Sequence, residues 1–89
     1  MPIKMSDIEV GREYKAGNNQ DRVVLGNAKK GRSKIVYASR SGKPGNSYNF
    51  RIVSEKGRFA KACYKIGQKL SAMNLKEIIE DTNASSLIR

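Results

Sequence analysis

The centre of the chain, residues 29–51, reads KKGRSKIVYASRSGKPGNSYNFR. It begins with a dense basic run and continues into a short β-like segment, Ile35 to Tyr37. A loop from Ser39 to Ser47 follows, which contains no hydrophobic residue and is rich in Gly, Ser and Asn. Strand-forming residues on both sides of such a loop predict two strands, at 34–38 and 48–53, joined by a functional loop.

The segments that precede this centre also indicate strands. After a lead-in at residues 1–7, residues 8–14 alternate apolar and charged side chains, the period of a half-buried strand. Gly11 within that pattern suits a bulge or a sharp bend. Residues 6–9 also match a helix capping box, but Gly11 follows where a helix would propagate, so we favour a strand. Residues 21–25, DRVVL, predict a second strand that is buried on both faces.

The segments that follow the centre indicate helices. Ser54 is a plausible N-cap, and a helix after it would place five apolar residues on one stripe. That stripe consists of Phe59, Ala62, Cys63, Ile66 and Leu70. A second short, acidic helix is predicted near residues 75–79, capped by Ser71 or Asn74.

A chain of 89 residues makes one domain. We expect its core to span about residues 7–80, with a frayed tail at about 82–89. Four short strands followed by helices predict an α+β fold. The spacing of the strands fits a small bent antiparallel sheet, or an SH3-like or OB-like barrel, of about four to five strands with one or two short helices toward the C-terminus.

The net charge of +10 is concentrated in the middle of the chain. Residues 29–69 carry twelve cations and one anion, Glu55, a net charge of +11, whereas residues 1–28 are neutral and residues 70–89 carry −1. Such a density of like charge is self-repulsive in a compact fold and favours a polyanionic partner.

Cations, a polar loop and aromatic rings together are typical of a nucleic-acid surface. Tyr37 and Tyr48 fit either a base-stacking role or the core, whereas the core is expected to take Tyr14, Phe50, Phe59 and Tyr64. The candidate nucleic-acid-binding residues are Lys29, Lys30, Arg32, Lys34, Tyr37, Arg40, Lys43, Asn46, Tyr48, Arg51, Lys56, Arg58, Lys61 and Lys65.

The residue types argue against catalysis and against a cofactor. The chain has no His, and its single cysteine, Cys63, is expected to be a small buried hydrophobe, so we predict no metal site, no disulfide and no enzyme activity. Lys43 is followed by Pro44, which does not match a phosphate-binding loop. No apolar run approaches the length of a membrane helix, and the free thiol fits a reducing cytoplasm.

Three expected strand segments, Val10 to Tyr14, Arg22 to Leu25 and Ile35 to Tyr37, are followed by a helix segment that contains Phe59-Ala60. The strands resemble the opening of small SH3-like barrels, and together with the helix segment they are similar to small proteins encoded by bacteriophages. The resemblance covers roughly residues 8–62. It implies a tiny basic domain that binds nucleic acid, or one that binds and inhibits a host enzyme.

The sequence therefore predicts a non-enzymatic nucleic-acid-binding module, with DNA placed ahead of RNA. One alternative is a phage-type interaction protein whose basic face binds an acidic surface of a host nucleic-acid enzyme. Another is a ribosome-associated RNA-binding protein.

Overall fold

The computed structural model describes residues 3–17, 19–28, 33–42, 47–48 and 50–87, without the side chains of residues 50 and 83–87. The described elements are five strands, two α-helices and one short 3-10 helix. In chain order they are η1 (Met5–Asp7), β1 (Arg12–Ala16), β2 (Gln20–Asn27), β3 (Lys34–Ser41), β4 (Phe50–Glu55), α1 (Lys56–Ala62), β5 (Cys63–Lys69) and α2 (Ala72–Leu87).

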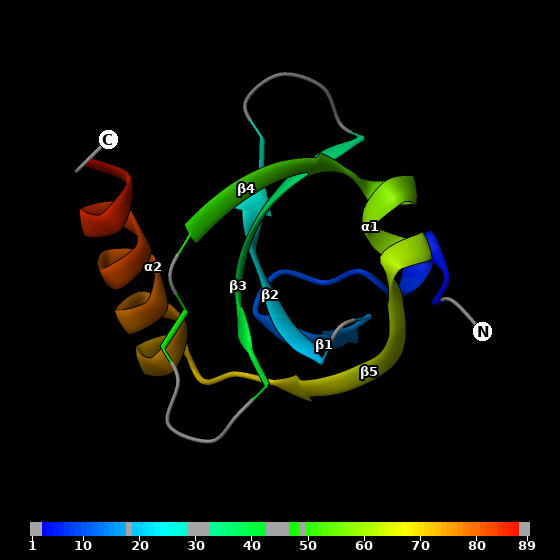
Figure 1. The fold of residues 1–89 in the computed structure, drawn as a ribbon, viewed down its shortest axis with the longest axis horizontal. Coiled ribbons are helices and arrows are strands. Elements are labelled where there is room, and N and C mark those ends of the chain that lie inside the picture. Colours follow the sequence, from blue (N-terminus) through cyan, green and yellow to red (C-terminus); the bar gives the residue numbers. More distant parts are fainter. Residues whose placement is uncertain (1–2, 18, 29–32, 43–46, 49, 88–89) are drawn as a thin grey trace.

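All five strands form one antiparallel sheet in the order β4-β3-β2-β1-β5. The sheet curves strongly, and the chain passes from β4 through α1 to β5 around its concave side (Figure 1). Within the described residues β4 and β5 do not pair, so the sheet is not closed into a barrel. The predicted α+β domain with a bent antiparallel sheet is confirmed.

One core cluster fills the concave face of the sheet. Phe59 of α1 is completely buried and packs edge-on against two rings, Tyr14 at 5.4 Å and Tyr37 at 4.9 Å between centroids. The remaining members are Ala16, Val24, Ile35 and Cys63. The short helix α1 is therefore held by its one large apolar side chain, because Phe59 closes this side of the sheet.

A second core cluster lies on the convex face and is covered by α2. Val23 and Ala38 of the sheet, together with Tyr48, pack against Leu75 and Ile78 of α2. Figure 1 shows the two helices on opposite sides of the sheet. Val23 and Val24 are each buried but belong to different clusters, which confirms that this strand is buried on both faces.

The first strand starts later than the alternation predicted. Residues 5–7 form η1, Val10 is 43% exposed, and β1 begins only at Arg12. Gly11, directly before it, has φ +87°, the left-handed conformation that favours glycine and makes the predicted sharp bend. The buried Tyr14 hydroxyl fixes this lead-in, since it donates to the carbonyl of Asp7 at 2.6 Å and accepts the N–H of Glu9 at 2.7 Å.

The predicted long helix after residue 54 is wrong beyond Ala62. The helix spans only Lys56–Ala62, its N-cap is Glu55 rather than Ser54, and residues 63–69 form β5 against β1. At Gly67 a Cβ would lie 3.0 Å from the carbonyl oxygen of Glu13, so the backbones of β5 and β1 approach closely at this glycine. Pairing with β1 thus overrides an apolar spacing that also suits a helix.

The C-terminal helix is longer than predicted. Ser71 caps it through a 3.2 Å hydrogen bond from the Asn74 N–H to Ser71 Oγ, as one predicted alternative had it. The helix then continues to Leu87, and Thr82, placed by prediction in a frayed tail, is fully buried. Its hydroxyl donates to the carbonyl of Ile78 at 2.8 Å and also accepts a bond from the sheet, so this part of the tail belongs to the folded domain.

Candidate nucleic-acid interface

Six described cations run along the start of β3, the whole of α1 and the length of β5. In the described part of the chain, none of them has a carboxylate within the 4.0 Å of an ion pair. We call this set the basic strip: Lys34, Lys56, Arg58, Lys61, Lys65 and Lys69. Five of them were predicted as nucleic-acid-binding residues, and the remaining one, Lys69, ends β5.

Backbone contacts bring the start of β3 beside α1. The N–H of Lys56 donates to the carbonyl of Ser33 at 2.6 Å, and Lys34 is the register partner of Glu55, the residue before α1. The N–H of Ala28, after β2, donates to the carbonyl of Lys34 at 3.1 Å. The end of the basic central run and the basic helix therefore meet at one place, although β3 and β4 separate them in the sequence.

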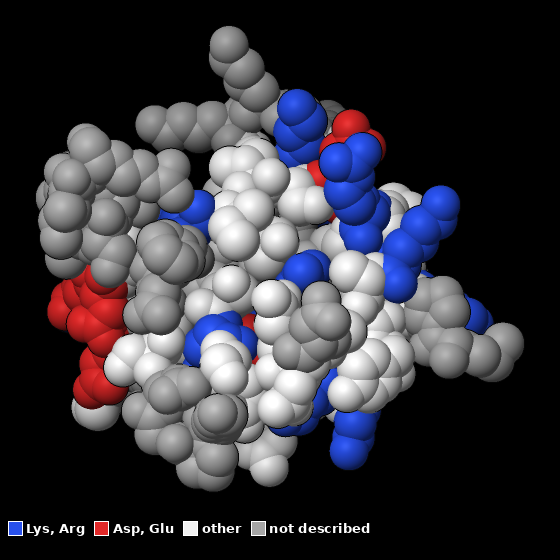
Figure 2. Space-filling view, viewed as in Figure 1, with Lys and Arg blue, Asp and Glu red and all other residues white. Residues whose placement is uncertain are grey.

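Positive and negative charges are separated across the molecule. Figure 2 shows acidic atoms gathered over α2 and most basic atoms toward the side of α1 and β5, with one acidic patch among them. The acidic residues of α2 are Glu77, Glu80 and Asp81, all exposed. Because these carboxylates lie on a different side from the basic strip, they do not neutralise it.

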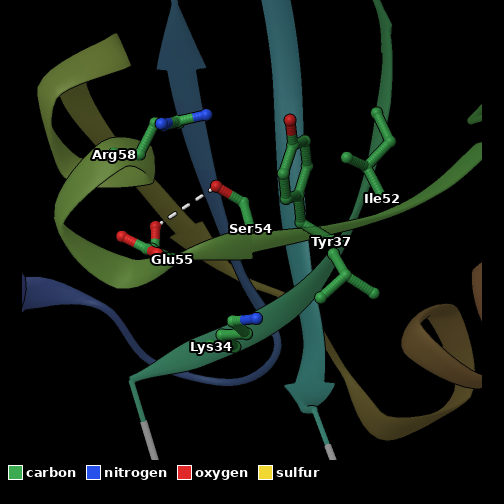
Figure 3. Close-up of a pocket in the computed structure, with 7 residues that line it drawn as sticks. Lys34, Tyr37, Ile52, Ser54, Glu55 and Arg58 are labelled. Atoms are coloured by element: carbon green, nitrogen blue, oxygen red, sulfur yellow. Dashed lines mark hydrogen bonds between the residues drawn. The ribbon is translucent and has the colours of Figure 1, made fainter. Parts of the chain in front are cut away.

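A cavity of about 350 Å³ opens within the basic strip, between β4 and α1. Lys34 and Arg58 line it with Tyr37 and Ile52, and Figure 3 shows Arg58 extending from α1 on the side of Ser54 and Tyr37. Ile52 is 36% exposed and its neighbour Val53 is 59% exposed. The cavity therefore combines cationic and apolar walls.

Arg40, a predicted contact residue, takes part in an internal polar network on the convex face. Its guanidinium donates to Asp21 at 3.2 Å, approaches Glu13 at 3.9 Å and lies 4.5 Å above the ring of Tyr48. Lys15 contacts the other oxygen of Asp21 at 2.7 Å. Two carboxylates thus balance these two cations, in contrast to the basic strip.

The same network shifts the pKa values of its members. Burial alone would raise the pKa of Asp21, but hydrogen bonds from Lys15 and Arg40 outweigh it and hold that pKa below its usual value. Burial, together with the charge of Glu13, raises the pKa of Tyr48, whose hydroxyl donates to Glu13 at 3.2 Å. Both shifts favour the protonation states that keep the network intact at neutral pH.

Arg51, another predicted contact residue, joins β4 to α2. Its Nε donates to Thr82 Oγ1 at 3.1 Å and its terminal nitrogen donates to the Ile79 carbonyl at 2.7 Å. These bonds hold the C-terminal part of α2 against the sheet. We therefore leave Arg51 out of the interface and assign it to the stability of the fold.

The tyrosines occupy other places than the sequence suggested. Tyr37 and Tyr48 are each only 7% exposed and belong to the two core clusters, so neither presents a ring face for stacking. Tyr64, predicted to lie in the core, is 54% exposed on β5. Neighbouring side chains in a strand point to opposite faces, so a strand at residues 63–69 with Cys63 buried would have predicted an exposed Tyr64.

One cation that the sequence did not single out lies on the concave face. The guanidinium carbon of Arg22 lies 4.8 Å from the ring centre of Tyr37 and 5.7 Å from that of Phe59. Its terminal nitrogen donates to Gln20 Oε1 at 3.3 Å, while its buried Nε has no hydrogen-bond partner in the structure described. It is a structural cation, stabilised mainly by aromatic faces.

Five predicted contact residues lie outside the described residues: Lys29, Lys30, Arg32, Lys43 and Asn46. The predicted core position of Phe50 also lies outside them, because its side chain is not described.

Among the residues that are described, no three Cys, Asp or Glu side chains are grouped as metal ligands would be. Cys63 is completely buried, as predicted. No helix within the described ranges is long and apolar enough to cross a membrane.

Comparison of the chain with models of protein families, with characterised proteins and with solved structures found no match. The functional argument therefore rests on the side chains of this chain and on their geometry.

Proposed function

We propose that the protein is a non-enzymatic nucleic-acid-binding module that contacts phosphates through the basic strip. The observation that carries this proposal is the contrast between two kinds of cation. Lys15 and Arg40 have carboxylate partners at 2.7 and 3.2 Å, whereas the six cations of the basic strip have no carboxylate partner among the described residues. Uncompensated cations on one side of a small domain are relieved by a polyanion, which releases its counterions when it binds.

The fold supports a finer interpretation of the architecture. The order β5-β1-β2-β3-β4, with a short helix that connects the two edge strands β4 and β5, fits an open SH3-like arrangement. In that arrangement α1 and β5 form one exposed side of the domain. The similarity to bacteriophage proteins stays a prediction.

The binding test is a salt titration of fluorescence anisotropy with labelled duplex DNA, single-stranded DNA and RNA of equal length. We expect micromolar or tighter binding at low salt. If about six phosphates are contacted, affinity falls roughly a thousandfold between 50 and 200 mM salt. Absence of micromolar binding to all three probes at low salt would refute the proposal.

A matched pair of single variants tests whether the basic strip, rather than net charge, is responsible. Lys61→Ala removes one exposed cation from the strip, and Lys76→Ala removes one exposed cation from α2. Both variants change the net charge equally. We expect the first to reduce the salt slope by about 1 and the second to leave it nearly unchanged. Equal reductions of the salt slope in the two variants would mean that nucleic acid is attracted by the net charge, without a defined interface.

The alternative, binding to an acidic protein surface, has one observation in its favour. The cavity beside Lys34 and Arg58 has exposed Ile52 and Val53 at its rim, which suits a partner with acidic and apolar side chains. A pull-down after nuclease treatment separates the two functions, because partners held through nucleic acid are released and direct protein partners are retained.

A further inference from the structure

Tyr64 is the one tyrosine of the four that projects from the folded domain. The exposed fraction of its side chain is 54%, against 1% for Tyr14 and 7% for both Tyr37 and Tyr48. It lies on β5, an edge strand that pairs only with β1 in the described sheet. An aromatic ring left exposed while the other three are buried is a candidate contact surface.

A β-bulge directs this side chain outward. Cys63 pairs with Ala16 and Lys65 pairs with Lys15, so two steps along β5 correspond to one step along β1 and Tyr64 is the extra residue. Cys63 is buried on the concave face, and its neighbour Tyr64 points away from that face. Bulges commonly re-aim side chains next to functional sites.

The surroundings of Tyr64 are cationic. Lys61 precedes it at the end of α1, Lys65 follows it, and both belong to the basic strip. Lys15, the register partner of Lys65, is paired with Asp21 at 2.7 Å and leaves Lys65 without a carboxylate partner in the described structure. A cavity of about 510 Å³ next to Lys65 is lined by Ile66 and Gln68 of β5 and also by the carboxylates of Glu13 and Asp21. The exposed ring therefore lies between Lys61 and Lys65 of the basic strip, beside a hollow of mixed polar and apolar lining.

A ring in this position distinguishes between kinds of nucleic acid. Base faces in a duplex are covered by their neighbours, whereas unpaired bases can stack on an aromatic side chain while cations hold the backbone. We propose that the nucleic acid held by the basic strip is single-stranded and that one of its bases stacks on Tyr64. This inference rests on the proposed function and adds the class of ligand to it.

The test compares single-stranded and duplex probes of one length on the full chain and on variants of Tyr64. Stacking of one base corresponds to about a 5- to 150-fold change in affinity. We expect Tyr64→Leu to weaken single-strand binding within that range and to leave duplex binding within about twofold, while Tyr64→Phe retains the wild-type affinity for both. Met73→Ala, which removes a side chain that is 73% exposed on α2, is the control for a general loss of apolar surface.

A spectroscopic readout makes the test independent of affinity. The chain contains no Trp, so Tyr64→Trp introduces a unique fluorophore. We expect its emission to be quenched by single-stranded probe and to change little with duplex. If neither probe binds the wild type, the proposed function fails. If the wild type binds but Tyr64→Leu and wild type have equal single-strand affinity, or Tyr64→Trp is not quenched, the stacking inference is overturned while the proposed function stands.

Discussion

Replacing Arg51 by Met should destabilise the fold without weakening nucleic-acid binding by the folded protein. The substitution keeps an apolar stem but removes the bonds to Thr82 Oγ1, at 3.1 Å, and to the Ile79 carbonyl, at 2.7 Å. A hydrogen bond from a charged group contributes about 1.5–3 kcal/mol. In the variant the Thr82 hydroxyl still donates to the Ile78 carbonyl at 2.8 Å, so this hydroxyl is not left without a hydrogen-bond partner. We therefore expect a loss of about 2–4 kcal/mol in the free energy of unfolding.

Urea denaturation followed by circular dichroism measures this loss. With a slope of about 1.3 kcal/mol per M, within the usual range for small proteins, the midpoint should fall by roughly 1.5–3 M. Arg51→Lys is an informative companion, because an ammonium keeps the charge but lacks the fork that reaches both acceptors, so its midpoint should lie between those of wild type and Met. A wild-type urea midpoint for Arg51→Lys would show that the positive charge at this position, and not the two hydrogen bonds of the guanidinium, stabilises the fold.

Arg58→Met is the matched control, since Arg58 is exposed and has no ion pair or hydrogen bond in the described structure. Its unfolding free energy should change by no more than about 0.5 kcal/mol, while its salt slope for binding should fall by about 1. The reasoning is refuted if Arg51→Met is as stable as wild type. It is equally refuted if the folded Arg51→Met protein loses as much affinity as Arg58→Met.

Three further predictions concern buried polar groups. Tyr14→Phe removes the two bonds that fix the N-terminal lead-in, at 2.6 and 2.7 Å, and should lower the unfolding free energy by about 1–3 kcal/mol in urea denaturation. Because the folded pKa of Asp21 is lowered, its ion pairs contribute stability above the ordinary carboxyl pKa and lose it as pH falls through the folded value. Wild type should thus lose more stability than Asp21→Asn between about pH 5 and pH 2, as measured by urea midpoints. Burial raises the pKa of the Cys63 thiol and outweighs the opposite effect of Arg22. A chromogenic disulfide reagent at pH 8 should therefore label Cys63 slowly in the native protein and fast in the urea-unfolded protein.

The sequence predicted four of the five strands, because their period is a local property, although β1 begins later than expected. Val23 and Val24 follow each other in a segment buried on both faces, and the two core clusters share them as expected. The segment from residue 63 to residue 69 was mistaken for helix, because Cys63, Ile66 and Leu70 also fit a helical stripe. The segment forms a strand because it pairs with β1, which is far away in the sequence.

The sequence indicated the region of the candidate site, but it could not decide which of the predicted side chains belong to it. The excess of charge in residues 29–69 is visible in the sequence, but the role of each cation depends on what faces it in the fold. Arg40 faces the carboxylate of Asp21, and Arg51 faces the carbonyl of Ile79. Neither acceptor is a sequence neighbour, so composition and periodicity could not separate these arginines from Arg58.

The distribution of the carboxylates supports the proposal that the basic strip is a surface for an external partner. Asp21 and Glu13 are used on the convex face, where they compensate Lys15 and Arg40. The acidic residues of α2 lie on the side that faces away from α1. Glu55, the one carboxylate within residues 29–69, lines the cavity with Arg58 but forms no ion pair in the described structure. The nearby carboxylates thus stabilise the sheet and do not compensate the strip, whose repulsion a polyanion would relieve under the proposed function.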